Sequence, residues 1–251
     1  MNIKKHIPNL LTLGNLFCGT VATIFAVEGN FLVAALFVVL GIFFDFFDGF
    51  AARLLNVSGE LGKQLDSLAD MVTSGVVPGI IMFNLLAPND FLGSSFEETE
   101  TMIWGGIKIA PLQLIGLLLT LGACYRLAKF NIDTRQTDSF IGLPTPAMSL
   151  FVISLPLILE YTEIEFVQNI MSNYYFLIGV TIVLTYLMNA EIPLFSLKFK
   201  DYTVKNNIIK YLFLLMSLVL IITLQYLSIP LIIILYVILS IVNNYGTKTP
   251  I

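Results

Sequence analysis

Long apolar runs alternate with short polar segments along this chain, and the runs have about the length that crosses a lipid bilayer. A membrane-spanning helix needs about 20 apolar residues, because the hydrocarbon core is about 30 Å thick and a helix rises about 1.5 Å per residue. We expect eight such helices, near residues 9–27, 31–54, 62–86, 109–130, 145–160, 172–190, 211–227 and 229–243. The pattern therefore predicts an all-α polytopic membrane helical bundle.

The spacing of the runs predicts one domain with a C-terminal hairpin. The last two runs are short and almost adjacent, and Pro230 lies at their junction, which favours a helical hairpin over about 211–243. We expect residues 1–251 to form a single membrane domain whose core covers about 1–200. The segment 87–107 is acidic and rich in turn residues, so we expect it to be a loop outside the bilayer.

The composition supports a membrane protein. Hydrophobic residues make up 57% of the chain and charged residues only 12%, whereas soluble domains carry about 25% charged residues. Both cysteines, Cys18 and Cys124, lie inside apolar runs, so we expect free thiols rather than a disulfide or a metal site. The expected environment is the lipid bilayer, and no nucleic acid partner is expected.

The basic residues predict the orientation in the membrane. Eight spans place both termini on one side, and twelve of the thirteen Lys and Arg residues then fall on that side, with only Lys108 opposite. The opposite segments carry acidic residues instead, namely Glu28, Asp90, Glu97, Glu98, Glu100, Glu160, Glu163 and Glu165. Because loops rich in Lys and Arg stay in the cytoplasm, we expect cytoplasmic termini in a protein of the cell inner membrane.

Four aspartates interrupt the apolar pattern between the second and third predicted spans. Asp45 and Asp48 are three residues apart, and Asp66 and Asp70 are four apart, so each pair shares one face of a helix. A turn near residues 56–59 would bring the two pairs together. Four neighbouring carboxylates in or near a bilayer need a counter-charge. Hard divalent cations prefer carboxylate oxygens, so the set favours Mg²⁺ or Mn²⁺ over zinc.

Small residues and one arginine surround these carboxylates. Gly49 and Ala52 share the helix face of the first pair, and Gly62 shares that of the second. Such a face leaves room for a metal-bound phosphate compound, and Arg53 can contact a phosphate oxygen. Two other interpretations stay open, because membrane carboxylates also form ion relays and Gly and Ala also serve helix packing.

These residues together match a known signature. The order Asp-x2-Asp-Gly-x2-Ala-Arg-x8-Gly-x3-Asp-x3-Asp resembles the motif of the CDP-alcohol phosphatidyltransferase family. Every fixed position is filled, by Asp45, Asp48, Gly49, Ala52, Arg53, Gly62, Asp66 and Asp70. The resemblance implies a membrane enzyme with a six-helix catalytic core, which acts on a CDP-linked lipid at the cytoplasmic face.

The family resemblance also implies roles for single residues. Asp45, Asp48 and Asp66 would hold two divalent cations, with Asp70 completing the metal cluster. Asp70 would also be the catalytic base that takes the proton of the attacking alcohol. The signature residues Gly49, Ala52, Arg53 and Gly62 would bind the CDP-lipid. General chemistry agrees, because two metals can polarise a phosphoryl group and stabilise the leaving CMP, while a nearby base activates the hydroxyl.

Three further segments resemble the phosphatidylserine synthase branch of this family. They are IPNLLTLGNLFCG at 7–19, LDSLADMVTSGVVP at 65–78, and RLAKFNI with FIGLPTPA at 126–132 and 140–147. The branch implies transfer of the phosphatidyl group from CDP-diacylglycerol to the hydroxyl of L-serine, with CMP as the second product. The nearest alternatives are the same chemistry with glycerol 3-phosphate or an inositol phosphate, and an ion-coupled transporter that uses the Asp cluster.

Candidate contacts to serine and to the nucleotide follow from side-chain chemistry. Arg126 and Asn131 can bind the serine carboxylate, and the hydroxyl of Thr145 lies in a stiff Pro-Thr-Pro turn. Arg126 can equally be one of the cytoplasmic basic residues, and the prolines can simply start the fifth span.

Three further polar residues are candidates for the CDP-lipid site. Asn9 and Thr12 can reach the nucleotide from the first span, or can instead cap that helix. Ser58 has the same two interpretations, with a turn as the second. The pair Gly75 and Gly79 fits a helix-packing contact and would suit a homodimer.

Overall fold

The computed structural model is helical throughout its long elements. It describes residues 6–57, 59–87, 102–104, 107–133, 140–195, 203 and 207–247. The first helices are α1 (His6–Val27), α2 (Phe31–Leu55), α3 (Glu60–Asp70), the π-helix η2 (Met71–Val76) and α4 (Val77–Leu85). Next come α5 (Gln113–Gly116), α6 (Leu118–Ile132), α7 (Thr145–Tyr161), α8 (Glu165–Met171) and α9 (Tyr174–Asn189). The last are α10 (Ile208–Leu224), the short 3₁₀ turn η5 (Gln225–Leu227) and α11 (Ser228–Thr247).

Helices α1 and α2 form an antiparallel pair through small residues. Ala22 and Ala26 on α1 and Ala34 and Val38 on α2 are fully buried, which lets the two backbones approach closely. The side chain of Asn30 caps α2 by accepting a hydrogen bond of 3.2 Å from the backbone N–H of Val33. This packing fixes the position of α2, which carries Asp45 and Asp48.

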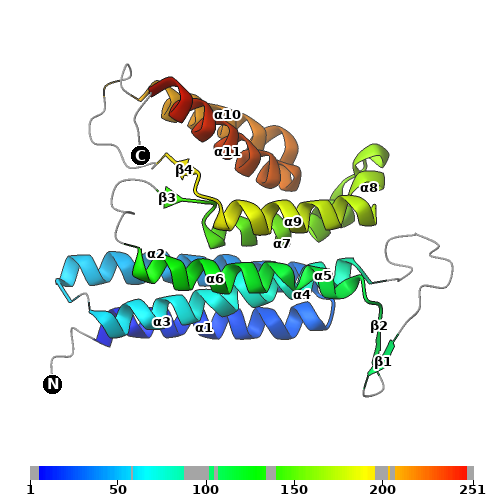
Figure 1. Cartoon of the computed structure of the whole chain (residues 1–251), viewed down its shortest axis with the longest axis horizontal. Helices are drawn as coiled ribbons and strands as arrows, with labels where there is room; N and C mark the ends of the chain where they lie inside the picture. Colours follow the sequence, from blue (N-terminus) through cyan, green and yellow to red (C-terminus); the bar gives the residue numbers. More distant parts are fainter. Residues whose placement is uncertain are drawn as a thin grey trace.

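The predicted turn between the second and third spans is confirmed. Helix α2 ends at Leu55, and Asn56 adopts the left-handed conformation with φ of 51°, which Asn tolerates better than most residues. Helix α3 begins at Glu60 and runs on through η2 and α4 as one helical stretch to Leu85. The reversal brings the start of this stretch back along α1 (Figure 1).

The glycine pair Gly75 and Gly79 packs inside the chain. A Cβ at Gly75 would lie 3.2 Å from the Cβ of Ala123, and one at Gly79 would lie 2.0 Å from Oγ1 of Thr120, both on α6. Thr120 also donates a hydrogen bond of 2.9 Å to the carbonyl of Gly75. The helix-packing interpretation agrees with this arrangement, because α6 occupies that face, and the homodimer stays a prediction.

Helices α7 and α9 lie beside α6 (Figure 1). Short strands lie before α5, between α6 and α7, and after α9. Strand β3 (Phe140–Ile141) pairs antiparallel with β4 (Pro193–Leu194), and β1 (Met102–Trp104) pairs antiparallel with β2 (Ile107–Ile109). Helix α8 meets α9 at an angle of 65°. The apolar pattern did not predict the strands or this bend, because each involves only a few residues.

The C-terminal helices form the predicted hairpin. Helices α10 and α11 pack side by side, and Gln225, with φ of 46°, breaks the helix between them (Figure 1). The hairpin contacts the rest of the bundle mainly through α11 and η5 against α7 and β4. It is thus an appendage to the α1–α9 bundle.

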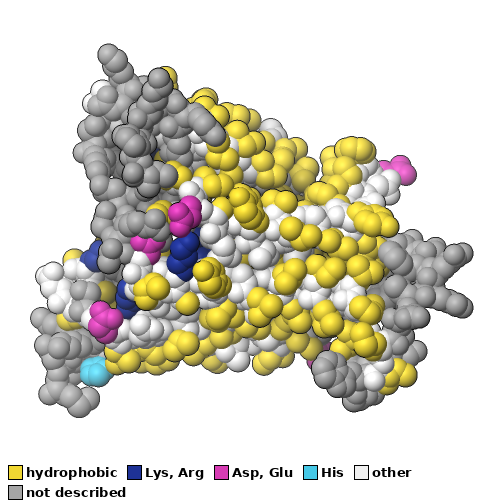
Figure 2. Space-filling view, in the orientation of Figure 1, with side chains coloured by type: hydrophobic (Ala, Val, Ile, Leu, Met, Phe, Trp, Pro, Cys, Tyr) yellow, Lys and Arg dark blue, Asp and Glu magenta, His cyan; other side chains and the backbone are white. Residues whose placement is uncertain are grey.

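Every predicted span coincides with a helix of the described residues. Five helical stretches are long and apolar enough to cross a membrane, or six if α8 and α9 count as one bent span. The fifth stretch, Ile208–Asn243, contains both predicted C-terminal spans, and α7 is a shorter apolar helix. Apolar side chains are spread over the visible surface of the helices, and Lys and Arg gather toward the end where α6 finishes (Figure 2). The protein is a polytopic α-helical membrane protein, and the count of eight spans stays a prediction.

Candidate active site

Three of the four predicted aspartates form a tight cluster. Asp45 and Asp48 project from α2 and Asp66 from α3, and one carboxylate oxygen from each lies within 4.8 Å of the others. Asp48 is buried, whereas Asp45 and Asp66 are half-buried. The i, i+3 spacing on α2 and the antiparallel return of α3 create this arrangement.

The donor set of the cluster fits a hard divalent cation. Three carboxylates this close repel one another unless a positive charge compensates them, and partial burial strengthens that repulsion. Oxygen-only ligands suit Mg²⁺ or Mn²⁺, and the group contains neither a histidine nor a cysteine. The residues present therefore fit the kind of metal that the sequence predicted.

Helix α1 supports the second aspartate. Thr12 on α1 is buried, and its hydroxyl lies 2.5 Å from Oδ2 of Asp48 and 3.1 Å from the carbonyl of Pro8. The sequence left Thr12 as either a nucleotide contact or a helix cap, and in the structure it hydrogen-bonds a proposed metal ligand. Such a contact orients the carboxylate, as outer partners of metal ligands commonly do.

Asp70 lies one helical turn beyond Asp66 and outside the three-carboxylate cluster. Its Oδ1 accepts a hydrogen bond of 3.1 Å from the amide of Asn15 on α1. The Oδ1 of Asn15 in turn accepts one of 2.7 Å from the hydroxyl of Thr73 in η2. The sequence interpretation missed Asn15 and Thr73, although Asn15 follows Thr12 by three residues, on the same face of α1.

The predicted lipid-binding positions border the cluster. Gly49 is exposed, and a Cβ built on it would meet nothing within 4 Å, so space is open beside this part of α2. A Cβ on Gly62 would lie 3.5 Å from Oδ1 of Asn9, which places the start of α3 next to α1. Arg53 is exposed one turn beyond Gly49, and Ala52 is half-buried. Ser58 lies outside the described residues.

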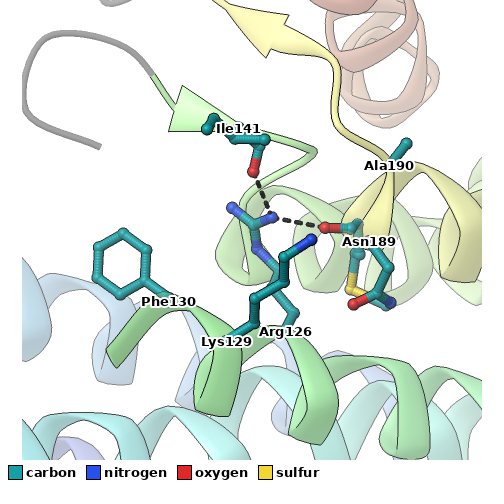
Figure 3. Close-up of a pocket in the computed structure, with 7 residues that line it drawn as sticks. Arg126, Lys129, Phe130, Ile141, Asn189 and Ala190 are labelled. Carbon is teal, nitrogen blue, oxygen red and sulfur yellow. Dashed lines mark hydrogen bonds between the residues drawn. The ribbon is translucent and has the colours of Figure 1, made fainter. Parts of the chain in front are cut away.

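Arg126 lies in a small pocket between α6, α9 and β3. Its NH1 donates hydrogen bonds of 2.9 Å to the carbonyl of Ile141 and 2.6 Å to that of Met188 (Figure 3). Gly142, with φ of +73°, packs against the same guanidinium, and a Cβ there would lie 2.9 Å from NH1. Lys129 lines this pocket and pairs with Glu191 at 3.3 Å. Arg126 therefore ties the β3 segment to the end of α9, a structural role that sequence analysis did not predict.

The other two candidate serine residues have different surroundings. Asn131 faces α3, where its Oδ1 accepts a hydrogen bond of 3.1 Å from Ser67, and its carbonyl accepts one from Lys63. Ser67 follows Asp66 directly, so Asn131 is linked to the helix that carries the third carboxylate. Thr145 is buried as the first residue of α7. The described structure thus connects Asn131 with the cluster helix, and it connects Arg126 with β3 and α9.

The fold and the cluster define a class: a polytopic helical membrane protein with a carboxylate centre near one end of its bundle. The sequence profile of the CDP-alcohol phosphatidyltransferase family matches residues 5–187, about three quarters of the chain. This protein belongs to the CDP-alcohol phosphatidyltransferase family.

The chain is similar to curated proteins whose names differ in the acceptor. The CDP-diacylglycerol–serine O-phosphatidyltransferase of Bacillus subtilis is 36% identical over 155 residues, 60% of this chain and 75% of that protein. The enzyme of the same name from Helicobacter pylori strain J99 is 34% identical over 148 residues, 58% of this chain and 55% of that protein. The CDP-diacylglycerol–glycerol-3-phosphate 3-phosphatidyltransferase of Aquifex aeolicus is 28% identical over 199 residues, 78% of this chain and 99% of that protein.

Proposed function

We propose that this protein transfers the phosphatidyl group of CDP-diacylglycerol to the hydroxyl of L-serine, giving phosphatidylserine and CMP. The cluster of Asp45, Asp48 and Asp66 carries the proposal, because these residues lie inside the matched range 5–187, fill positions of the signature that the sequence resembles, and have oxygens that converge. The names of the Bacillus and Helicobacter relatives support serine as the acceptor.

Asp45, Asp48 and Asp66 are the residues that would hold a divalent cation, Mg²⁺ or Mn²⁺, and two such ions are proposed. When bound, the ions would polarise the phosphoryl group and neutralise charge on the departing CMP. The open space beside Gly49 supports an approach of the pyrophosphate to α2, and Arg53 on the same helix can contact a phosphate oxygen.

Asp70 is the proposed base. It takes the proton of the serine hydroxyl while that oxygen bonds to the phosphorus of the phosphatidyl group. The bond between this phosphorus and the CMP oxygen breaks at the same time, and CMP carries away the electron pair. Asp70 suits this task because it stands one turn from Asp66 on one helical stretch.

The serine carboxylate is assigned to Arg126 and Asn131, with Thr145 as a further contact. Of these, Asn131 has the stronger structural support, because its contacts to Lys63 and Ser67 hold it against the cluster helix. The NH1 of Arg126 already serves two backbone carbonyls, so serine would have to use the rest of its guanidinium.

The proposed orientation places both termini and the Asp cluster on the cytoplasmic side of a cell inner membrane. The excess of Lys and Arg on that side supports it. The test introduces single cysteines at Ser95 and Asp138 in a background without Cys18 and Cys124. In intact cells, an impermeant thiol reagent is expected to modify the cysteine at position 95 and to leave the one at position 138 unmodified. The reverse labelling pattern would invert the model of insertion.

One assay separates serine from other acceptors. Purified protein with CDP-diacylglycerol and Mg²⁺ or Mn²⁺ is offered labelled serine, glycerol 3-phosphate and inositol phosphate in separate reactions. A labelled lipid product, phosphatidylserine, is expected only in the reaction that contains serine. A product with glycerol 3-phosphate, the acceptor named for the Aquifex relative, would keep the chemistry and change the substrate. Ion uptake into vesicles without any CDP-lipid turnover would favour a transporter instead.

A further inference from the structure

A hydrogen-bonded chain of three polar side chains, those of Thr73, Asn15 and the proposed base Asp70, crosses between helices. Asn15 on α1 and Thr73 in η2 are both completely buried. The Thr73 hydroxyl lies 2.7 Å from Oδ1 of Asn15 and 3.2 Å from the backbone carbonyl of Asn15, and its one proton goes to the nearer oxygen, Oδ1. The Asn15 amide donates to Oδ1 of Asp70 at 3.1 Å. Burying such groups is costly unless they are paired, so this chain is a specific feature of the interior.

Two glycines on different helices leave the space that this chain occupies. A Cβ at Gly19 on α1 would lie 2.2 Å from Oγ1 of Thr73, and a Cβ at Gly41 on α2 would lie 2.8 Å from Oδ1 of Asn15. Any larger residue at either position would push one member of the chain aside. Both helices are thus built around the Asn15–Thr73 pair.

The direction of the chain follows from its chemistry. An amide has a donor end and an acceptor end, and a carboxylate accepts only. With the Thr73 hydroxyl donating to its oxygen, the Asn15 amide must turn its N–H toward Asp70. Without that hydroxyl, the buried Asn15 oxygen would lose this donor, and the amide would lose the contact that fixes its orientation.

From this geometry we infer that Asn15 and Thr73 are positioning residues for Asp70. Thr73 fixes the Asn15 amide, Asn15 holds Oδ1 of Asp70, and the other carboxylate oxygen is directed toward the acceptor hydroxyl. The inference rests on the proposed function, because it gives Asp70 the part of the base. The π-helix η2 begins directly after Asp70 and contains Thr73, and such segments are frequent at functional sites.

The test compares three threonine variants of the full chain in detergent or lipid nanodiscs. Thr73→Val keeps the shape and removes the hydroxyl, while Thr73→Ser keeps the hydroxyl. Thr120→Val is the matched control, because the Thr120 hydroxyl also donates to η2, but to the carbonyl of Gly75 and not to Asn15 or Asp70. The measurements are kcat, KM for each substrate, and Mn²⁺ binding followed by electron paramagnetic resonance.

Thr73→Val is expected to lower kcat about tenfold, which is typical when a functional side chain loses the hydrogen-bond partner that orients it. The KM for each substrate should change less than about twofold. Thr73→Ser should restore turnover, Thr120→Val should resemble the wild type, and all three should bind Mn²⁺ normally. Wild-type kcat in Thr73→Val, an equal loss in Thr120→Val, or failure of Thr73→Ser to restore turnover would overturn the inference.

A second variant covers the case in which Thr73→Val does not fold. Asn15→Leu removes the donor to Asp70, and it should lower kcat at least as much while Mn²⁺ binding persists. Wild-type turnover in Asn15→Leu would overturn the inference and leave the proposed function intact. If the wild type bound Mn²⁺ but transferred no phosphatidyl group to any acceptor, the proposed function would fail, and the inference would fail with it.

Discussion

The α1–α4 region and the C-terminal hairpin are both built from apolar helices, yet their interiors differ sharply. More than half of the most apolar window in Glu60–Leu85 is buried (56%), compared with 11% in Ile208–Asn243. The first region encloses carboxylates, amides and hydroxyls in hydrogen-bonded contacts, whereas the described part of α10 buries only Phe213 and Ser217. The family profile covers the first region and ends before the hairpin.

This difference shows how one apolar composition serves two purposes. Where helices pack closely through Gly and Ala, polar side chains can be buried with partners and held in fixed positions. Where a helix faces outward, as α10 does with Leu215, Leu218 and Ile222, its side chains suit lipid and need no precise packing. We therefore expect substitutions to affect turnover strongly in the first region and weakly in the second.

The largest expected effect is that of metal removal. A chelator such as EDTA in excess should abolish transfer. Without the metal, the three clustered carboxylates would lose their counter-charge, and nothing would polarise the phosphoryl group. Turnover should return on addition of Mg²⁺ or Mn²⁺, measured as CMP release. Full turnover in excess EDTA would show that the cluster does not work through a metal.

Arg126→Ala should have an intermediate effect that separates its two roles. If Arg126 binds the serine carboxylate, the loss of a charge-assisted hydrogen bond, about 1.5–3 kcal/mol, should raise the KM for serine roughly tenfold to a hundredfold. The KM for the CDP-lipid should change little. A lower melting temperature with an unchanged KM for serine would instead leave Arg126 as the residue that joins β3 to α9.

The smallest effect is expected in the hairpin. Ile222 in α10 is 73% exposed, so Ile222→Ala should change turnover by less than about twofold and stability by less than about 0.5 kcal/mol. Thermal unfolding and the CMP assay on the same preparation check both. A tenfold loss of turnover would mean that the hairpin contributes to the reaction and that the two regions are not separate in function.

The apolar pattern and the signature spacing predicted much of the fold and part of the site. Runs of bilayer length located the helices, and the i, i+3 spacing of Asp45 and Asp48 with the turn at Asn56 predicted the convergence with Asp66. These features are local, so a single segment of sequence contains them.

The features that were missed depend on contacts between distant segments. Asn15 meets Thr73 across 58 positions of the chain, and neither residue type is distinctive by itself. Gly79 appeared available to a second copy because the sequence does not show that Thr120 covers it. The carbonyl partners of Arg126 are backbone atoms, which no residue pattern can indicate.

The most direct test of the central claim is transfer of labelled serine by Asp45→Asn and Asp66→Asn, with Ile222→Ala as the control. Each Asp→Asn change keeps the shape and removes one charge from the cluster, at a cost of several kcal/mol in the transition state. Each is therefore expected to lower turnover about a thousandfold or more while the protein still inserts into the membrane. Near-normal turnover in either Asp variant would contradict the assignment of the reaction to the α2–α3 carboxylates.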